Sequence, residues 1–121
     1  MQFTRHFKQS EFACKHCGES KPNLALAIIL EDVREAFSAP VTINSSYRCE
    51  EHNKAVGGAA SSQHLLGTAA DIVVQGVSPA EVYSYLSIRP YADNIGLGKY
   101  NTFTHIDVRG HRARWDNTYV G

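Results

Sequence analysis

The clearest apolar pattern in the chain is a helical one, in residues 23–38, NLALAIILEDVREAFS. Its apolar side chains recur three or four positions apart, which is the spacing of one helix face. They are Leu26, Ile29, Leu30, Val33 and Phe37. Asn23 stands just before them and is a preferred N-cap residue. The pattern predicts a helix with one buried face.

A second helix is predicted from residue 78, where the sequence reads SPAEVYSYLS. A proline at the first helical position follows Ser78, and Glu81 comes three residues after the serine, which together form a capping box. Residues 47–62 are turn-rich, with a glycine pair as a breaker. The tail HRARWDNTYVG is polar and holds one tryptophan.

Shorter segments show the patterns of strands. Residues 40–45, PVTINS, open with a proline and then alternate, and residues 70–75, ADIVVQ, form a β-branched run. Residues 94–110 are typical of two strands around a turn near Tyr100 and Asn101. The segments predict an α+β domain, with helices packed on one side of a small, mainly antiparallel sheet.

Length and composition indicate a soluble globular protein, and we expect one domain over residues 1–121. Twelve basic residues balance twelve acidic ones, so we expect neither nucleic acid nor an anionic membrane as a partner. The longest apolar run, LALAIIL, is far too short to span a membrane. The start, MQFTRHFKQSEF, lacks the apolar core of a signal peptide. We therefore expect a protein made in the cytoplasm, and a monomer.

Residues 103–109, FTHIDVR, gather ionisable groups on one face of a predicted strand. Side chains alternate along a strand, so Ile106 and Val108 fall on the core face. The other face carries Phe103, His105, Asp107 and Arg109. Two interpretations stay open from strand geometry: a functional site, or a solvent-facing strand whose charges pair with each other.

The stretch SSQHLLGTAAD places His64 and Asp71 seven residues apart, with small residues between them that keep the turn narrow. With His105 they would supply two imidazoles and a carboxylate, the ligands of a catalytic zinc site with water in the fourth position. Zinc in such a site acidifies its bound water. Three unrelated polar residues are the alternative.

Three cysteines cannot all pair with one another. Cys14 and Cys17 form a CKHC motif, and Cys49 stands in YRCEEH. With His16 or His52 they would give four ligands suited to zinc. Reduced thiols or one disulfide are the other interpretations that the sequence leaves open.

The stretch SQHLLGTAAD fills every fixed position of the S-x-H-x-x-G-x-A-x-D signature of zinc D-Ala-D-Ala carboxypeptidases, and the chain resembles that family. Upstream, SSYRCEEHN is similar to the family's S-G-Y-R segment, with Ser46 where glycine is usual. Downstream, FTHIDVRG resembles the strand with the third ligand. The resemblance covers residues 45–110. The family shares the hedgehog-like fold and includes phage L-alanyl-D-glutamate endolysins.

The resemblance implies a zinc metallopeptidase that hydrolyses peptidoglycan stem peptides, as a D-Ala-D-Ala carboxypeptidase or an L-Ala-D-Glu endopeptidase. It implies Zn²⁺ held by His64, Asp71 and His105. Arg48 would stabilise the oxyanion or hold a substrate carboxylate. Ser62 would bind substrate or the loop backbone. The implied setting is a phage lysis or tail-associated protein that acts on the cell wall after release from the bacterial cytoplasm.

The sequence departs from the family at the general base. Many relatives carry a base three or two residues before the last histidine, where this chain has Thr102 and Phe103. Asp107 is the nearest ionisable candidate, either as proton carrier or as a partner of His105 or an arginine. The departure keeps a second function open, a non-catalytic zinc-containing binding module of the same fold.

Overall fold

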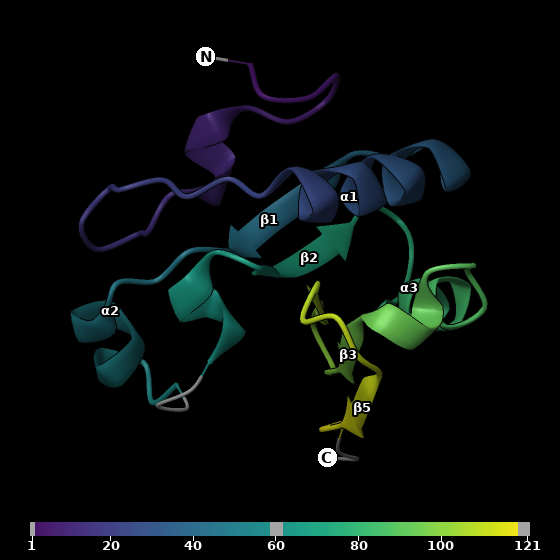
Figure 1. Cartoon of the computed structure of the whole chain (residues 1–121). Helices are drawn as coiled ribbons and strands as arrows, with labels where there is room; N and C mark the ends of the chain where they lie inside the picture. The colour runs from purple at the N-terminus through teal and green to yellow at the C-terminus, as the bar shows by residue number, and fades with distance from the viewer. Residues whose placement is uncertain (1, 59–61, 119–121) are drawn as a thin grey trace.

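The computed structural model describes residues 2–58 and 62–118, and its centre is one five-stranded sheet (Figure 1). The sheet order is β1-β2-β4-β3-β5. The strands are β1 (Val41–Ser45), β2 (Ala69–Val74), β3 (Gly96–Lys99), β4 (Thr104–Asp107) and β5 (Ala113–Asp116). Neighbours pair antiparallel except β3 and β5, which are parallel. The predicted small, mainly antiparallel sheet in an α+β fold is therefore confirmed.

Two helices pack on one face of this sheet. Helix α1 (Leu24–Ala36) contacts β1 and β2, and α3 (Pro79–Ser87) contacts β2, β3 and β4. The core between helices and sheet includes Leu26, Leu30, Val33, Ile43, Ala70, Ile72, Val82, Leu86, Leu97 and Ile106. Because side chains alternate along β2 and β4, Asp71 and His105 lie on the opposite face of the sheet.

The predicted caps of both helices are present. Leu26 N–H donates to Asn23 Oδ1 at 3.0 Å, and Glu81 N–H donates to Ser78 Oγ at 3.2 Å. These bonds satisfy amides that have no partner inside the helix. The sequence therefore located the start of each helix correctly.

One α-helix and one strand were missed. Helix α2 (Glu50–Ala55) lies in the segment expected to be turn-rich, and its six residues are too short to show helical periodicity. Residues 59–61 of that segment lie outside the described residues. Strand β5 lies in the polar tail and pairs with β3 from Gly96↔Ala113 to Lys99↔Asp116.

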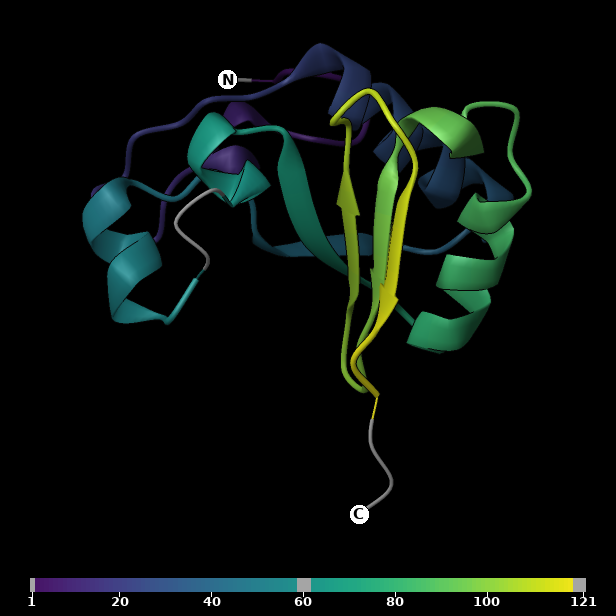
Figure 2. The ribbon, with the colours of Figure 1, turned by 60° about the horizontal axis from the view of Figure 1, so that its bottom comes forward.

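The remaining elements are short. The 3₁₀ turns in the described part of the chain are η1 (Gln9–Phe12), η2 (Gln63–Leu66) and η3 (Ala92–Asn94). In Figure 2, α2 and α3 lie at opposite ends of the molecule, with β3, β4 and β5 between them. Within residues 2–58 and 62–118, no helix has both the length and the apolar character that crossing a membrane requires.

Candidate metal centre and active site

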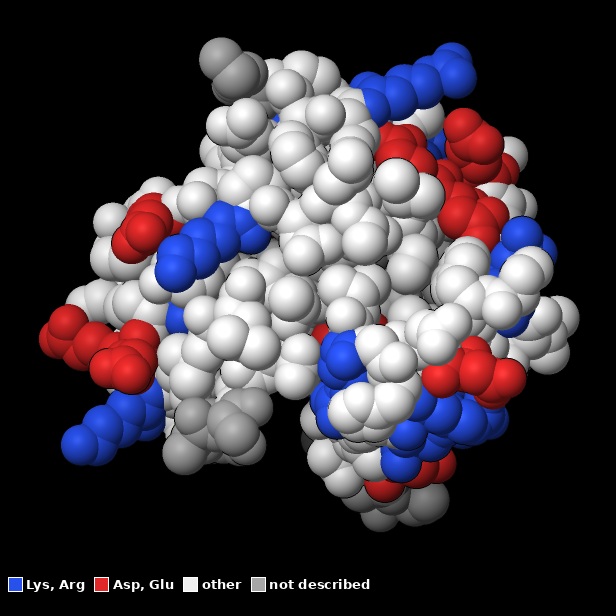
Figure 3. All heavy atoms as spheres, viewed as in Figure 1, with Lys and Arg blue, Asp and Glu red and all other residues white. Residues whose placement is uncertain are grey.

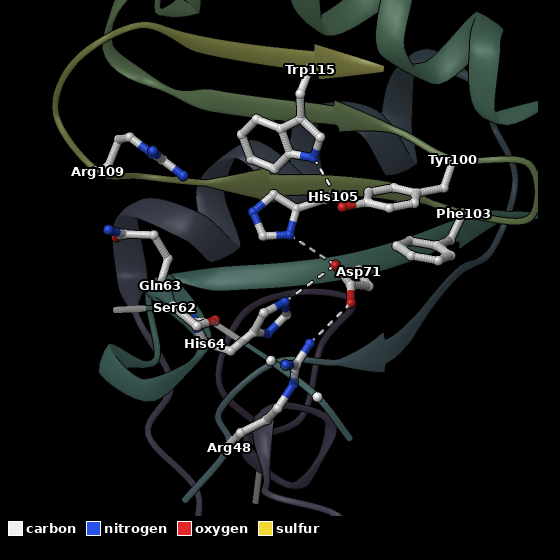
Figure 4. A pocket seen from close by; sticks show the side chains of 12 residues that line it. Arg48, Ser62, Gln63, His64, Asp71, Tyr100, Phe103, His105, Arg109 and Trp115 are labelled. Carbon is white, nitrogen blue, oxygen red and sulfur yellow. Dashed lines mark hydrogen bonds and ion pairs between the residues drawn. The ribbon is translucent and has the colours of Figure 1, made fainter. Parts of the chain in front are cut away.

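His64, Asp71 and His105 converge on one point (Figure 4). Asp71 and His105 are directly opposite each other in the β2–β4 register, and His105 Nδ1 lies 2.9 Å from Asp71 Oδ1. His64 Nε2, from η2, lies 3.3 Å from the same oxygen. All three residues are buried, and their potential ligand atoms lie within 4.8 Å of one another. The structure thus brings together the three residues predicted from the sequence.

The turn that ends η2 positions His64 beside Asp71 and His105. Gly67 ends η2 with a φ of 74°, and its N–H donates to His64 O at 3.2 Å. A Cβ on Gly67 would come 2.7 Å from Lys21 O, so any larger residue here would collide with that backbone. The positive φ would also strain a residue that has a side chain. Ser62 caps the other end, where its Oγ accepts from His64 N–H at 3.2 Å. Ser62 also lines the cleft described below.

In each imidazole, the nitrogen that does not face Asp71, here called the far nitrogen, has a hydrogen-bond acceptor. His64 Nδ1 lies 2.6 Å from Ser46 O, and His105 Nε2 lies 2.8 Å from Asp107 Oδ2. If the near nitrogen of each ring bound a metal, the ring hydrogen would lie on the far nitrogen, where these oxygens accept it. The near nitrogens, His64 Nε2 and His105 Nδ1, would then be the ligand atoms beside Asp71 Oδ1. Two such nitrogens and a carboxylate oxygen fit the ligand set of a three-ligand zinc site.

Burial and charge act against each other at the two carboxylates. Burial raises the pKa of Asp71, but the His105 and His64 rings outweigh it and hold that pKa well below its usual range. Burial likewise raises the pKa of Asp107, but Arg109 and His105 outweigh burial and hold that pKa well below its usual range. Arg109 Nε and Nη2 lie 2.7 and 2.8 Å from the two Asp107 oxygens. Both carboxylates are therefore charged at neutral pH.

The burial of the β4 side chains decides between the two interpretations of residues 103–109, a functional site or a solvent-facing strand. Ile106 is in the core, and Val108 packs against it, as predicted. His105 and Asp107 are buried on the other face. The interpretation of a solvent-facing strand is therefore wrong.

Arg48 follows β1, and two hydrogen bonds and one ion pair hold its guanidinium. Its Nη2 lies 3.6 Å from Asp71 Oδ2, its Nε donates to Ser45 Oγ at 3.2 Å, and its Nη1 donates to Asn53 Oδ1 at 2.9 Å. A Cβ on Gly58 would collide with Asn53 Oδ1. The sequence did not predict this contact between the buried Asn53 and Arg48.

A cleft of about 440 Å³ opens over the three converging side chains. Figure 3 shows the hollow between the lobe with α2 and the lobe with β3 and β5, with blue atoms on one wall. The described lining residues are Arg48, Gly57, Gly58, Ser62, Gln63, His64, Asp71, Tyr100, Phe103, His105, Arg109 and Trp115. Asp71 is the one carboxylate among them. Asp107 lies behind the His105 ring.

Three aromatic residues form part of the lining, and two of them were not expected. Trp115 Nε1 donates to Tyr100 Oη at 2.9 Å, and the Tyr100 ring stacks on Phe103 with centroids 4.3 Å apart. The Trp115 ring centroid lies 5.0 Å from that of His105. Gly98 pairs with His105 on one side and with Trp115 on the other, and a Cβ there would collide with the indole. The missed signal is the GLG in β3, since glycine in a strand often marks a close approach.

The sequence profile of the peptidase M15 family matches residues 3–107, which include every site residue predicted from the sequence. The chain belongs to the peptidase M15 family. This result confirms the resemblance to the zinc D-Ala-D-Ala carboxypeptidase family. M15 peptidases are metal-dependent, and the convergence of His64, Asp71 and His105 agrees with that chemistry. No curated protein sequence matches the chain.

Proposed function

We propose that this M15 chain is a zinc peptidase that hydrolyses peptidoglycan stem peptides at a D-Ala-D-Ala or an L-Ala-D-Glu bond. The observation that carries the proposal is the buried set His64, Asp71 and His105 at the floor of an open cleft. Zinc would be held by His64 Nε2, Asp71 Oδ1 and His105 Nδ1. When bound, zinc polarises a peptide carbonyl and acidifies water.

Arg48 supplies the positive charge for the reacting carbonyl. Its guanidinium is fixed by Ser45 and Asn53 before substrate arrives, so little reorganisation is needed when negative charge develops on the carbonyl oxygen. The same planar group can pair with a substrate carboxylate through two hydrogen bonds. Stem peptides carry such carboxylates, which supports this substrate class.

Tyr100 offers a second hydrogen-bond donor to the substrate. Its hydroxyl oxygen accepts from Trp115 Nε1, so its own hydrogen is available to a carbonyl in the cleft. The rings of Tyr100, Phe103 and Trp115 give the wall an apolar surface that displaces water from the peptide. Ser62 is in the lining with its oxygen bonded to the His64 amide, which supports a mainly structural role.

We assign Asp107 to positioning His105 and not to carrying a proton. It lies behind the imidazole, it is fully buried, and Arg109 contacts both of its oxygens. Water in the cleft would meet the His105 ring before it met this carboxylate. A carboxylate that accepts from a ligating histidine fixes the orientation of the ring and raises its basicity.

The test is zinc content together with hydrolysis of purified peptidoglycan and of defined stem peptides. Wild type should carry zinc and release new amino groups, His64→Ala should do neither, and the exposed His111→Ala should match wild type. Mass spectrometry of the products names the bond: free D-alanine for a carboxypeptidase, a new D-glutamyl amino terminus for an endopeptidase. Zinc-loaded wild type that releases nothing would contradict the proposed reaction. A monomer that reaches the wall after release from a phage-infected cell is part of the same proposal.

A binding module is the second candidate, because Asp71 is the one carboxylate among the described lining residues. The positions that carry a base in many relatives are Thr102, which is exposed, and Phe103. A binding module would retain zinc and sediment with peptidoglycan without hydrolysing it. A large gain of activity in Thr102→Glu would indicate that the natural chain lacks a base.

A further inference from the structure

A second group of metal-ligating side chains lies outside the cleft lining, at the N-terminal segment and α2. The sulfur atoms of Cys14, Cys17 and Cys49 all lie within 4.8 Å of one another, and Cys14 Sγ is 3.7 Å from Cys49 Sγ. All three thiols are free in the structure. A disulfide needs two sulfurs, whereas here three converge from two distant segments of the chain.

The backbone around Cys14 and Cys17 forms a tight turn that aims both thiols the same way. Cys14 N–H donates to Glu19 O at 2.8 Å, and Gly18 N–H donates to Cys14 O at 2.9 Å. Gly18 has a φ of 77°, a left-handed conformation that a residue with a side chain adopts only with strain. The turn is thus built to hold the CKHC motif in one conformation.

Backbone amides surround the sulfurs. Cys49 N–H donates to Cys14 Sγ at 3.5 Å, and His52 N–H donates to Cys49 Sγ at 3.4 Å. Burial raises the pKa of the Cys14 thiol, but the amides of Cys17, Cys49 and His16 outweigh it and lower that pKa to about 6. Amide donors stabilise sulfur in its thiolate form, which is the form that binds metal.

Two histidines are close to these cysteines in the sequence. His16 lies between Cys14 and Cys17 in the chain, and His52 follows Cys49 by about one helical turn. The His16 and His52 rings stack, with centroids 6.0 Å apart and planes 4° from parallel. No nitrogen of either ring belongs to the group that the three sulfurs form, so one ring of this pair would have to turn toward the sulfurs to become the fourth ligand. Three thiolates with one imidazole are a set that zinc takes in closed, structural sites.

We propose that Cys14, Cys17 and Cys49 bind a structural zinc ion, with an imidazole of the His16–His52 pair as the fourth ligand. The ion would join the N-terminal segment to the start of α2. Arg48 immediately precedes Cys49, and its N–H donates to His64 O at 3.0 Å. The second site would therefore hold the backbone from which Arg48 reaches Asp71.

The test uses the full chain, purified with a reductant and without chelator, and loaded with zinc or with Co²⁺. Wild type should hold about two zinc ions per chain, and His64→Ala and Cys17→Ser about one each. With Co²⁺, wild type and His64→Ala should show the near-ultraviolet thiolate-to-cobalt absorption, and Cys17→Ser should lose most of it. Lys15→Ser, an exposed change in the same turn, is the matched control and should keep the absorption. His16→Ala and His52→Ala are compared to identify the fourth ligand, because only the variant that lacks this ligand should bind the metal more weakly.

Two results would overturn the proposal: no thiolate-to-cobalt absorption in folded wild type, or a mass lower by two hydrogens that reveals a disulfide. Cys17 is exposed, so its replacement by serine leaves the core intact. The cobalt absorption does not depend on peptidase activity. If wild type hydrolyses no peptide but His64→Ala still shows the cobalt absorption, the proposed function fails and the proposal of a cysteine site stands.

Discussion

The imidazole of His105 lies between two carboxylates, with Nδ1 2.9 Å from Asp71 Oδ1 and Nε2 2.8 Å from Asp107 Oδ2. Asp71 comes from the neighbouring strand, and Asp107 comes from the same strand two residues on. One contact faces the cleft and the other faces the protein interior. In the proposed zinc site, Asp71 would therefore bind the metal, and Asp107 would orient the His105 ring.

Asp107→Asn should weaken zinc binding about 10- to 100-fold, because the neutral amide no longer raises the basicity of His105 and loses its charge pairing with Arg109. Competition with a chromogenic chelator measures the affinity. Asp93→Asn, an exposed carboxylate paired with Arg112, is the control and should change nothing. Loss of hydrolysis with unaltered zinc affinity would instead indicate that Asp107 carries a proton.

Gly98→Ala should displace the Trp115 indole and destabilise the fold by about 1–3 kcal/mol, the usual cost of overpacking. Trp115 is the single tryptophan of the chain, so its fluorescence reports the displacement directly. In a Trp115→Ala background the collision is gone, and the added cost of Gly98→Ala should fall close to zero in a double-mutant cycle. An equal cost in both backgrounds would show that strand backbone, not the indole, is the reason for glycine.

Much of this fold follows from local sequence signals. The periodic run of α1, the capping box of α3 and the turn at Tyr100 each predict an element that the structure contains. Strand β5 was not predictable in this way, since its four residues, ARWD, have little apolar alternation. Its strand conformation depends on pairing with β3, which is a non-local interaction.

The candidate metal ligands were predictable because a compact signature contains two of them and one alternating strand contains the third. The residues of the cleft wall could not be predicted from the sequence. Trp115 reaches His105 only through the sheet register across Gly98, and Asn53 reaches Arg48 only after α2 forms. Contacts that depend on strand register or on a short helix correspond to no regular spacing in the sequence, so the sequence alone does not predict them.

Arg48→Lys should lower kcat/KM about 10²- to 10³-fold, the loss typical of removing one donor to a developing oxyanion. Lysine keeps the charge but cannot contact Ser45, Asn53 and Asp71 together as the guanidinium does. Zinc content should stay at the wild-type level, which separates this loss from damage to the metal centre. Arg112→Lys, at an exposed arginine, should keep full activity. Wild-type kinetics in Arg48→Lys would remove Arg48 from the proposed machinery.

The last prediction concerns stability away from the cleft, at Asp32 in α1. Its carboxylate accepts from Tyr85 Oη at 2.7 Å, from Tyr91 Oη at 2.5 Å and from Arg89 Nε at 3.1 Å. Burial raises the pKa of Asp32, but Tyr91, Tyr85 and Arg89 outweigh it, and the folded-state pKa lies below the unfolded value. Ionised Asp32 therefore stabilises the fold above the unfolded pKa, and the contribution is lost as the pH falls through the folded pKa.

Asp32→Asn should accordingly cost about 1.5–3 kcal/mol at pH 7, the range for hydrogen bonds to a charged group. Urea unfolding at a series of pH values measures the difference from wild type. That difference should be constant from neutral pH down to about pH 5 and should shrink below about pH 4, where the carboxylate becomes protonated first in the unfolded chain and, at lower pH, in the folded one. Asp93→Asn should follow the wild-type curve throughout. A difference that persists unchanged into acid would show that the geometry of the hydrogen bonds, and not the charge, provides the stabilisation.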